Sequence, residues 1–190
     1  VPFGDLEALE AELAREDVAL FLVEPVQGQG VVLPDAAYLP GAQELCRRYG
    51  TLFCVDEVQT GFGRTGTMLA CEHWGLEPDL ITVAKSIAAG LPLSGVIGRA
   101  EIMDGAHAGA IGGTYIGNPV AQAAALAVLD VFADENLVAR AETVGARIRE
   151  RMLSWQARWP STLARRSPSP SFSRASSNNS ASRSLAMNIR

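Results

Sequence analysis

Four short apolar segments constrain the fold of this chain more than any other feature of its sequence. Near-continuous apolar runs of this length are typical of strands that are covered on both faces. Helical patterns lie between and after them, and strands that alternate with helices indicate a mainly parallel sheet. The sequence therefore predicts an α/β protein with helices on both faces of the sheet. The four segments are 18–23, 51–55, 80–84 and 93–98.

The first three of these segments each run directly into an ionisable residue. Glu24, Asp56 and Lys85 follow the last apolar residue of the three predicted strands. Ligands of parallel α/β sheets bind just beyond the carboxyl ends of the strands. We therefore expect these three side chains to converge on one cleft.

The helical segments carry recognisable start and stop residues. Leu6, Leu9 and Leu13 have the spacing of one helical face, and Asp5 is placed as the N-cap of that helix. Proline is favoured at the first position of a helix and glycine just after its end. Further helices are accordingly predicted over 36–48 with Gly50 as terminator, over 119–132 after Asn118, and over 137–153.

The composition changes near Pro160 and divides the chain in two. All 21 acidic residues lie at or before Glu150, whereas most of the serines and five arginines lie after Pro160. Residues 1–159 are predicted to form the folded part, and residues 160–190 a disordered Ser/Arg-rich tail. A nucleic-acid-binding arm is the alternative for the basic tail, but Phe172 is its only aromatic residue. No nucleic-acid partner is expected.

Other site classes and locations are not favoured by the sequence. No apolar run is long enough to span a membrane, and no signal-like segment opens the chain. The three cysteines are predicted to be reduced, which indicates a cytoplasmic protein. His73 and His107, the only histidines, do not stand at ligand spacing from each other or from a cysteine, so no metal site is expected.

Lys85 is the only lysine of a chain that contains 16 basic residues. It lies at a strand end between apolar segments, so we expect apolar atoms around its stem. Desolvation favours the uncharged amine, which can attack a carbonyl group, whereas arginine stays protonated. A lone lysine is otherwise most often a surface charge, but its position at the strand end favours chemistry.

Asp56 precedes Lys85 by 29 residues, at the end of the neighbouring predicted strand. A buried carboxylate needs a partner. In an enzyme that uses pyridoxal phosphate, that partner is the ring nitrogen of the cofactor. Taken alone, an aspartate that caps a local turn is an equally good interpretation.

The segment GFGRTG (61–66) fits the G-x-G-x-x-G pattern of dinucleotide-binding loops. That pattern needs a strand directly before it and a helix that opens at its last glycine. Here DEVQT separates the loop from the strand, and no helix cap follows. A dinucleotide site is therefore not expected.

Three long motifs resemble the class III (omega) aminotransferases, and within them the 4-aminobutyrate group. They are VDEVQTGFGRTG, PDLITVAKSIAAGLPLSGVIGRAEIMD and GGTYIGNPVAQAAALAVLDV. The similarity runs in one register from about Val18 to Trp159. It implies part of the large domain of a fold-type I enzyme that depends on pyridoxal phosphate.

The resemblance also implies roles for the residues that match the motifs. Lys85 would carry the cofactor as a Schiff base and move the substrate proton, and Asp56 would pair with the pyridinium nitrogen. Val58 would pack on the ring face, and Gln59 would bind near the phenolic oxygen. Thr114 would bind the phosphate of the partner subunit's cofactor, which implies a homodimer.

Glu24 resembles the glutamate that pairs with a substrate-reading arginine, so that one site accepts an omega-amine and then glutamate. The chain departs from the family pattern EPVQGEGG in this loop, with Gln29 and Val31 in place of an acid and a glycine. The family's upstream phosphate-binding turn and its C-terminal small domain are not found in this chain. Our hypothesis for the abrupt change of composition near Pro160 is a shift of reading frame.

The resemblance implies transamination of an omega-amino acid, 4-aminobutyrate in the first place, with 2-oxoglutarate as amino acceptor. Ornithine, acetylornithine and diaminopelargonate aminotransferases share the core motifs, as do the semialdehyde aminomutases, so the amine substrate stays open. A second hypothesis is a catalytically dead fragment, which keeps the lysine and the aspartate but lacks other binding groups.

Overall fold

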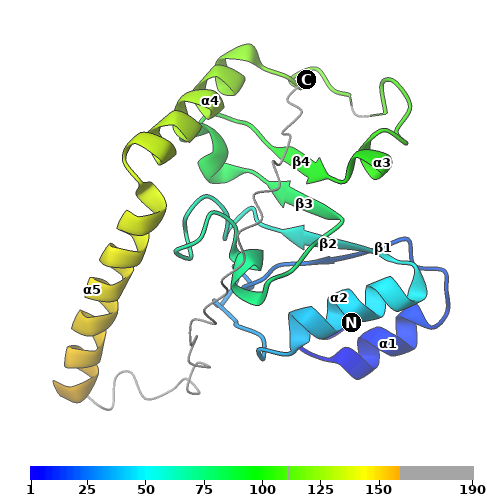
Figure 1. Ribbon diagram of the computed structural model, residues 1–190, viewed down its shortest axis with the longest axis horizontal. Helices are drawn as coiled ribbons and strands as arrows, with labels where there is room; N and C mark the ends of the chain where they lie inside the picture. Colours follow the sequence, from blue (N-terminus) through cyan, green and yellow to red (C-terminus); the bar gives the residue numbers. More distant parts are fainter. Residues whose placement is uncertain (111, 159–190) are drawn as a thin grey trace.

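The computed structural model describes residues 1–110 and 112–158, and it is an α/β fold built on a four-stranded sheet (Figure 1). The strands lie side by side in sequence order, with the first three parallel and the last antiparallel to its neighbour. This arrangement confirms the prediction of an α/β protein with a mainly parallel sheet. The strands are β1 (Leu20–Val23), β2 (Leu52–Asp56), β3 (Leu80–Val83) and β4 (Gly95–Gly98).

All four predicted helices are present, and in three of them a capping residue explains one end of the helix. Asp5 accepts a hydrogen bond from the Ala8 amide at 2.9 Å, and Asn118 caps the later helix in the same way. Gly50 ends the second helix in the left-handed conformation, with φ of 67°. The helices are α1 (Leu6–Leu13), α2 (Tyr38–Tyr49), α3 (Ala100–Met103), α4 (Pro119–Asp134) and α5 (Leu137–Arg158), with 3-10 turns η1 (Ala70–Trp74) and η2 (Lys85–Ala88).

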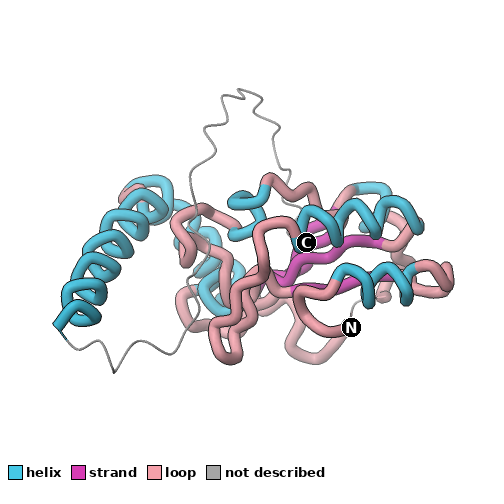
Figure 2. Tube along the Cα trace, turned by 90° about the horizontal axis from the view of Figure 1, so that it is seen from below, coloured by secondary structure: helices cyan, strands magenta, loops and turns pink. Residues whose placement is uncertain are grey.

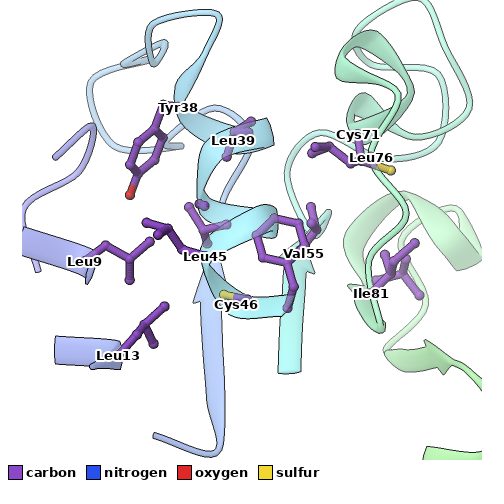
Figure 3. Packing of buried hydrophobic residues seen from close by; sticks show 14 of the residues in the cluster. Leu9, Leu13, Tyr38, Leu39, Leu45, Cys46, Val55, Cys71, Leu76 and Ile81 are labelled. Atoms are coloured by element: carbon purple, nitrogen blue, oxygen red, sulfur yellow. The ribbon is translucent and has the colours of Figure 1, made fainter. Parts of the chain in front are cut away.

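Helix α1 packs against α2, and α2 packs against β2 of the sheet (Figure 2). The core between them and the strands is apolar, and Leu9, Leu39 and Val55 are at most 2% exposed in it (Figure 3). Burial of a side chain of this size contributes about 1.5–3 kcal/mol. Packing of α2 on β2, which pairs with β1, therefore holds the strands whose ends carry Glu24 and Asp56.

The opposite face of the sheet carries part of the predicted site. Strand alternation and the observed register place Leu22, Asp56, Thr82 and Val96 on this face. In the described part of the chain, Leu22 is 51% exposed and Val96 is 44% exposed. Helical cover of this face is therefore less complete than the sequence predicted, and Asp56 stays half-buried.

The two C-terminal helices differ in how they are held. Helix α4 packs against η2, the turn that Lys85 opens, and buries Ala121 and Ala125. Helix α5 extends away from the sheet (Figure 1), and none of its residues is buried. Across the described residues, no helix combines the length and apolarity that crossing a membrane requires. The predicted tail over 160–190 lies outside the described residues.

The three cysteines are free and buried. Burial raises the pKa of the Cys46 and Cys54 thiols to about 11, with nearby carboxylates adding to the effect. Burial and the neighbouring charge of Glu57 raise the pKa of Cys71 to about 12. At a pH where the thiols of the unfolded chain begin to ionise, all three thiols of the folded chain therefore remain protonated.

These raised pKa values predict that the chain loses stability in alkaline solution. A folded-state pKa above the unfolded value stabilises the fold below the unfolded pKa, and that stability is lost as the pH rises. We expect the urea midpoint to fall between about pH 9 and about pH 11, because ionisation of the thiols favours the unfolded chain. The Cys71→Ala variant should show a shallower fall. An equal fall in both proteins would contradict a role for this thiol.

Candidate active site

The parallel register brings the first two predicted site residues to the same edge of the sheet. Val23 pairs with Val55, so Glu24 and Asp56 are the next residues along two adjacent strands. Both side chains line a pocket of about 290 Å³, together with Phe21 and Tyr38 among others. Convergence of these two carboxylates is confirmed.

Lys85 follows the end of β3 by two residues and opens η2. Because β3 runs parallel to β2, Lys85 lies beyond the same edge of the sheet as Asp56. It is not among the residues that line the pocket of Glu24 and Asp56. The sheet therefore groups the three residues at one edge, but the pocket contains only two of them.

The expectation that apolar atoms enclose the stem of Lys85 is wrong. Lys85 is exposed, because Ile87 and Ala88 take the buried positions of η2. Its backbone φ is 45°, in the left-handed region that costs a non-glycine residue about 1–2 kcal/mol. Such strained residues cluster at functional sites. The turn thus directs the only amine side chain of the chain outward at the sheet edge.

Asp56 uses one of its carboxylate oxygens in a local turn. Its Oδ1 accepts a hydrogen bond from the Val58 amide at 2.9 Å. This contact is the turn cap that the sequence left open as an alternative, but it occupies only one oxygen. Asp56 pairs in register with Thr82, whose hydroxyl oxygen is the only buried side-chain nitrogen or oxygen without a hydrogen-bond partner in residues 1–110 and 112–158.

Glu24 and Gln59 meet at Gly28. The Oε2 atom of Glu24 accepts a hydrogen bond from the Gly28 amide at 2.8 Å. A Cβ at Gly28 would lie 2.8 Å from Nε2 of Gln59, so a side chain there would displace the glutamine. The loop of Glu24 and the turn of Asp56 are therefore in close contact through Gly28 and the Gln59 side chain, which would have to shift if residue 28 carried a Cβ.

The rest of this loop is held by a short antiparallel bridge. The Gln27 amide donates to the Val32 carbonyl at 3.0 Å, and Val31 between them has a φ of 53°. Val31 is 64% exposed. A β-branched residue thus takes a left-handed position where the family pattern has glycine, which strains the loop next to Glu24.

The other two residues implied by the resemblance lie apart from the pocket. Val58 is half-buried at the turn after β2, next to the exposed Gln59. Thr114 is exposed in the loop that precedes α4, and it does not line the pocket of Glu24 and Asp56. Helix α4 packs on η2. The Thr114 loop leads into α4 and Lys85 opens η2, so each of the two residues lies next to one partner of this helix–turn contact.

Glu57 belongs to the site region but was not singled out by the sequence. It is 1% exposed, and its carboxylate accepts hydrogen bonds from the Thr60 hydroxyl and from the Cys71 amide. The available signal was strand alternation, because a side chain two residues after the core residue Val55 points to the same face. Among the described residues, no group of three or more histidine, cysteine or acidic side chains could hold a metal ion.

Comparison with known proteins identifies the family. The family model of class III aminotransferases matches residues 3–164. The probable 4-aminobutyrate aminotransferase of Bacillus subtilis is 50% identical over 151 residues, which cover 79% of this chain and 35% of the relative. The 4-aminobutyrate aminotransferase of Escherichia coli is 48% identical over 144 residues, which cover 75% of this chain and 34% of the relative. The chain belongs to the class III aminotransferase family.

Solved structures of the family share this fold. Ornithine aminotransferase from Toxoplasma gondii superimposes with a TM-score of 0.76 at 45% identity, covering 80% of this chain and 36% of that one. That structure carries pyridoxal phosphate at partial occupancy in its active site. The fold-type I prediction is thereby confirmed. The chain spans about a third of the length of the relatives that it matches.

The residues at the sheet edge fit a cofactor of this chemistry. A pyridoxal phosphate needs an amine, a carboxylate for its ring nitrogen and hydrogen-bond donors for its oxygens. Lys85 supplies the exposed amine, and Asp56 has an oxygen that its turn does not use. The Thr82 hydroxyl, buried beside Asp56 without a partner, is a donor of the required kind.

The unpartnered hydroxyl of Thr82 predicts an unusual response to Thr82→Val. A buried polar group without a hydrogen bond costs about 1–3 kcal/mol, so its removal at constant shape should raise the free energy of unfolding by about 1 kcal/mol. Urea denaturation of the apo chain measures the change. The matched control is Thr51→Val, which should destabilise the chain because the Thr51 hydroxyl donates to the Val18 carbonyl at 2.9 Å. A loss of stability in Thr82→Val would show that the hydroxyl is satisfied.

Proposed function

We propose that this chain carries the cofactor-binding part of an aminotransferase that depends on pyridoxal phosphate. The proposed reaction moves the amino group of an omega-amino acid, 4-aminobutyrate in the first place, to 2-oxoglutarate. One observation carries the proposal. The only lysine of the chain and a half-buried aspartate lie at the ends of adjacent parallel strands in a member of the class III family.

Four residues at and beyond the strand ends are proposed to contact the cofactor. Lys85 would hold the cofactor covalently through its amine, and Asp56 would pair with the ring nitrogen. Val58 and Gln59 would border the ring, because they continue the turn that Asp56 begins. When bound, the cofactor supplies an electron sink for the bond that is broken at the substrate carbon.

The protein's own groups would move and hold protons around that bond. The Lys85 amine, exposed at the sheet edge, can take a proton from the substrate carbon and return it. Asp56 is kept in orientation by the Val58 amide, which leaves its other oxygen for a positive charge. Glu24, fixed by the Gly28 amide, would pair with an arginine that reads the second carboxylate of glutamate.

We also propose a homodimer, in which Thr114 contributes to the partner subunit's phosphate site. The exposure of Thr114, away from the pocket of Glu24 and Asp56 in its own chain, supports this arrangement. The site lies in a protein that we place in the cytoplasm, because three free and buried thiols are typical of reducing compartments.

Reductive trapping tests the assignment of Lys85. The purified chain is mixed with pyridoxal phosphate, reduced with borohydride and examined by intact mass and peptide mapping. We expect one adduct at Lys85 that is absent from Lys85→Ala, because the chain offers only this lysine and its terminal amine for the reaction. Asp56→Asn should weaken cofactor binding by about tenfold or more, since a carboxylate–cation contact is lost. An adduct confined to the terminal amine would refute the proposal.

The exposure of Lys85 favours one alternative, a chain that binds the cofactor without turning over. An exposed amine lacks the enclosure that orients and desolvates a reacting lysine. A coupled assay for glutamate formation from 4-aminobutyrate and 2-oxoglutarate distinguishes the two. We expect a low rate from this chain that is abolished in Lys85→Ala. Robust turnover would exclude the inactive alternative, and turnover in the alanine variant would exclude Lys85.

The relatives are named for different amine substrates, so the choice of amine is tested among them. Proteins 45–50% identical to this chain include 4-aminobutyrate aminotransferases, and a 5-aminovalerate aminotransferase of Pseudomonas putida is 50% identical. Ornithine aminotransferases share the fold. Running the same assay with 4-aminobutyrate, 5-aminovalerate and ornithine ranks these substrates.

A further inference from the structure

We propose that Glu57 is a positioning residue for the cofactor site, and that its buried carboxylate fixes the turn that presents Asp56, Val58 and Gln59. This inference rests on the proposed function. The Glu57 clamp is defined here as Glu57 together with its two hydrogen-bond partners, Thr60 and Cys71.

The clamp joins the two ends of a long loop. Glu57 directly follows β2, whereas Cys71 lies 14 residues later in η1. The Cys71 amide donates to Oε1 of Glu57 at 2.7 Å, and the Thr60 hydroxyl donates to Oε2. Both carboxylate oxygens are therefore occupied inside the protein, and the loop that starts at the site is closed on itself.

The backbone of Glu57 is held as firmly as its side chain. Its amide donates to the Thr82 carbonyl at 2.9 Å, and its carbonyl accepts from the Gly61 amide at 2.9 Å. A Cβ at Gly61 would lie 2.8 Å from the Glu57 carbonyl oxygen, so the chain can fold this closely only with glycine there. The segment from Asp56 to Gly61 thus wraps around Glu57 and is attached to β3.

The residues that the clamp holds are those that would touch the cofactor. Oδ1 of Asp56 accepts from the Val58 amide, so the orientation of the aspartate depends on the backbone on both sides of Glu57. Gln59 follows one residue later and packs against Gly28, whose amide binds Glu24. Movement of the 57–60 turn would therefore displace the ring-nitrogen partner and the Gln59 side chain together.

Burial makes the clamp costly to release. Glu57 is 1% exposed, and a buried donor or acceptor that loses its partner keeps the full penalty of its desolvation. The Cys71 thiol reports the same environment, since burial and the Glu57 charge raise its pKa to about 12. Reaction of this thiol with an alkylating reagent therefore measures whether the clamp is closed.

The experiment compares Glu57→Gln with Glu72→Gln. Glutamine keeps the volume of Glu57 but offers one acceptor oxygen in place of two, so one donor of the clamp is left unpaired. Glu72 is the matched control, because its Oε1 accepts from the Leu69 amide at 2.7 Å in the same loop but at the surface. Three quantities are measured in each variant: the dissociation constant of pyridoxal phosphate, the absorbance of the bound cofactor against pH, and the alkylation rate of Cys71.

We expect Glu57→Gln to weaken cofactor binding by about tenfold, to shift the pH dependence of the bound cofactor's absorbance and to speed Cys71 alkylation by about tenfold or more. The absorbance shift is the deciding result. A displaced Asp56 changes the protonation of the ring, whereas a loosely packed loop lowers occupancy and leaves the bound spectrum unchanged. We expect Glu72→Gln to match the wild-type chain in cofactor affinity and absorbance, and to speed Cys71 alkylation much less than Glu57→Gln does, because the Glu72 charge is a smaller cause of the raised pKa of that thiol.

Two outcomes would overturn the proposal. One is a bound cofactor with wild-type affinity and spectrum in Glu57→Gln, and the other is an equal loss in Glu72→Gln. Failure of the proposed function looks different, because the wild-type chain itself would then give no adduct at Lys85. In that case the alkylation rate decides whether the clamp exists, since an unchanged rate in Glu57→Gln rejects it and a faster rate supports it.

Discussion

Parallel pairing of β1, β2 and β3 is the constraint from which the candidate site follows. Parallel strands end at the same edge of a sheet, so residues that are far apart in sequence meet there without any direct attraction between them. Glu24, Asp56 and Lys85 are separated by about 30 residues each, yet the register of the three strands brings them to one edge. Helix α2, which packs on β2 and is itself covered by α1, holds that register in place. A slip by one residue would turn Asp56 toward the core and remove it from this face.

The loops beyond the strands turn this edge into a site. Gly28 brings the loop of Glu24 against Gln59, and Glu57 closes the loop that begins at Asp56. Lys85 begins its turn in a left-handed conformation, which is unfavourable for a residue other than glycine. The outward orientation of its side chain therefore comes with a conformational cost. Backbone amides donate hydrogen bonds to the carboxylates of Glu24 and Asp56. Precise orientation of a reacting group requires support of this kind.

Several elements could be predicted because their causes are local. Asp5, Asn118 and Gly50 cap helices through contacts with their own neighbours, and the strands follow from runs of apolar residues. The exposure of Lys85 could not be predicted in this way. Its apolar flanks suggested burial, but Ile87 and Ala88 occupy the interior in its place. The role of Glu57 was missed for a related reason, because its partner Cys71 lies 14 residues away and is reached only through the folded loop.

The sequence by itself determined the fold class, the family and the identity of the residues at the strand ends, because apolar periodicity, capping residues and long motifs are properties of neighbouring positions. Only the tertiary structure decided which face each residue occupies and which donors satisfy it. It showed that Asp56 uses one carboxylate oxygen in its own turn and that the Thr82 hydroxyl is buried without a hydrogen-bond partner. It also showed that the buried Glu57 carboxylate has two hydrogen-bond partners. These facts depend on distances between segments that are remote in the chain, and such distances are set by packing rather than by local preference.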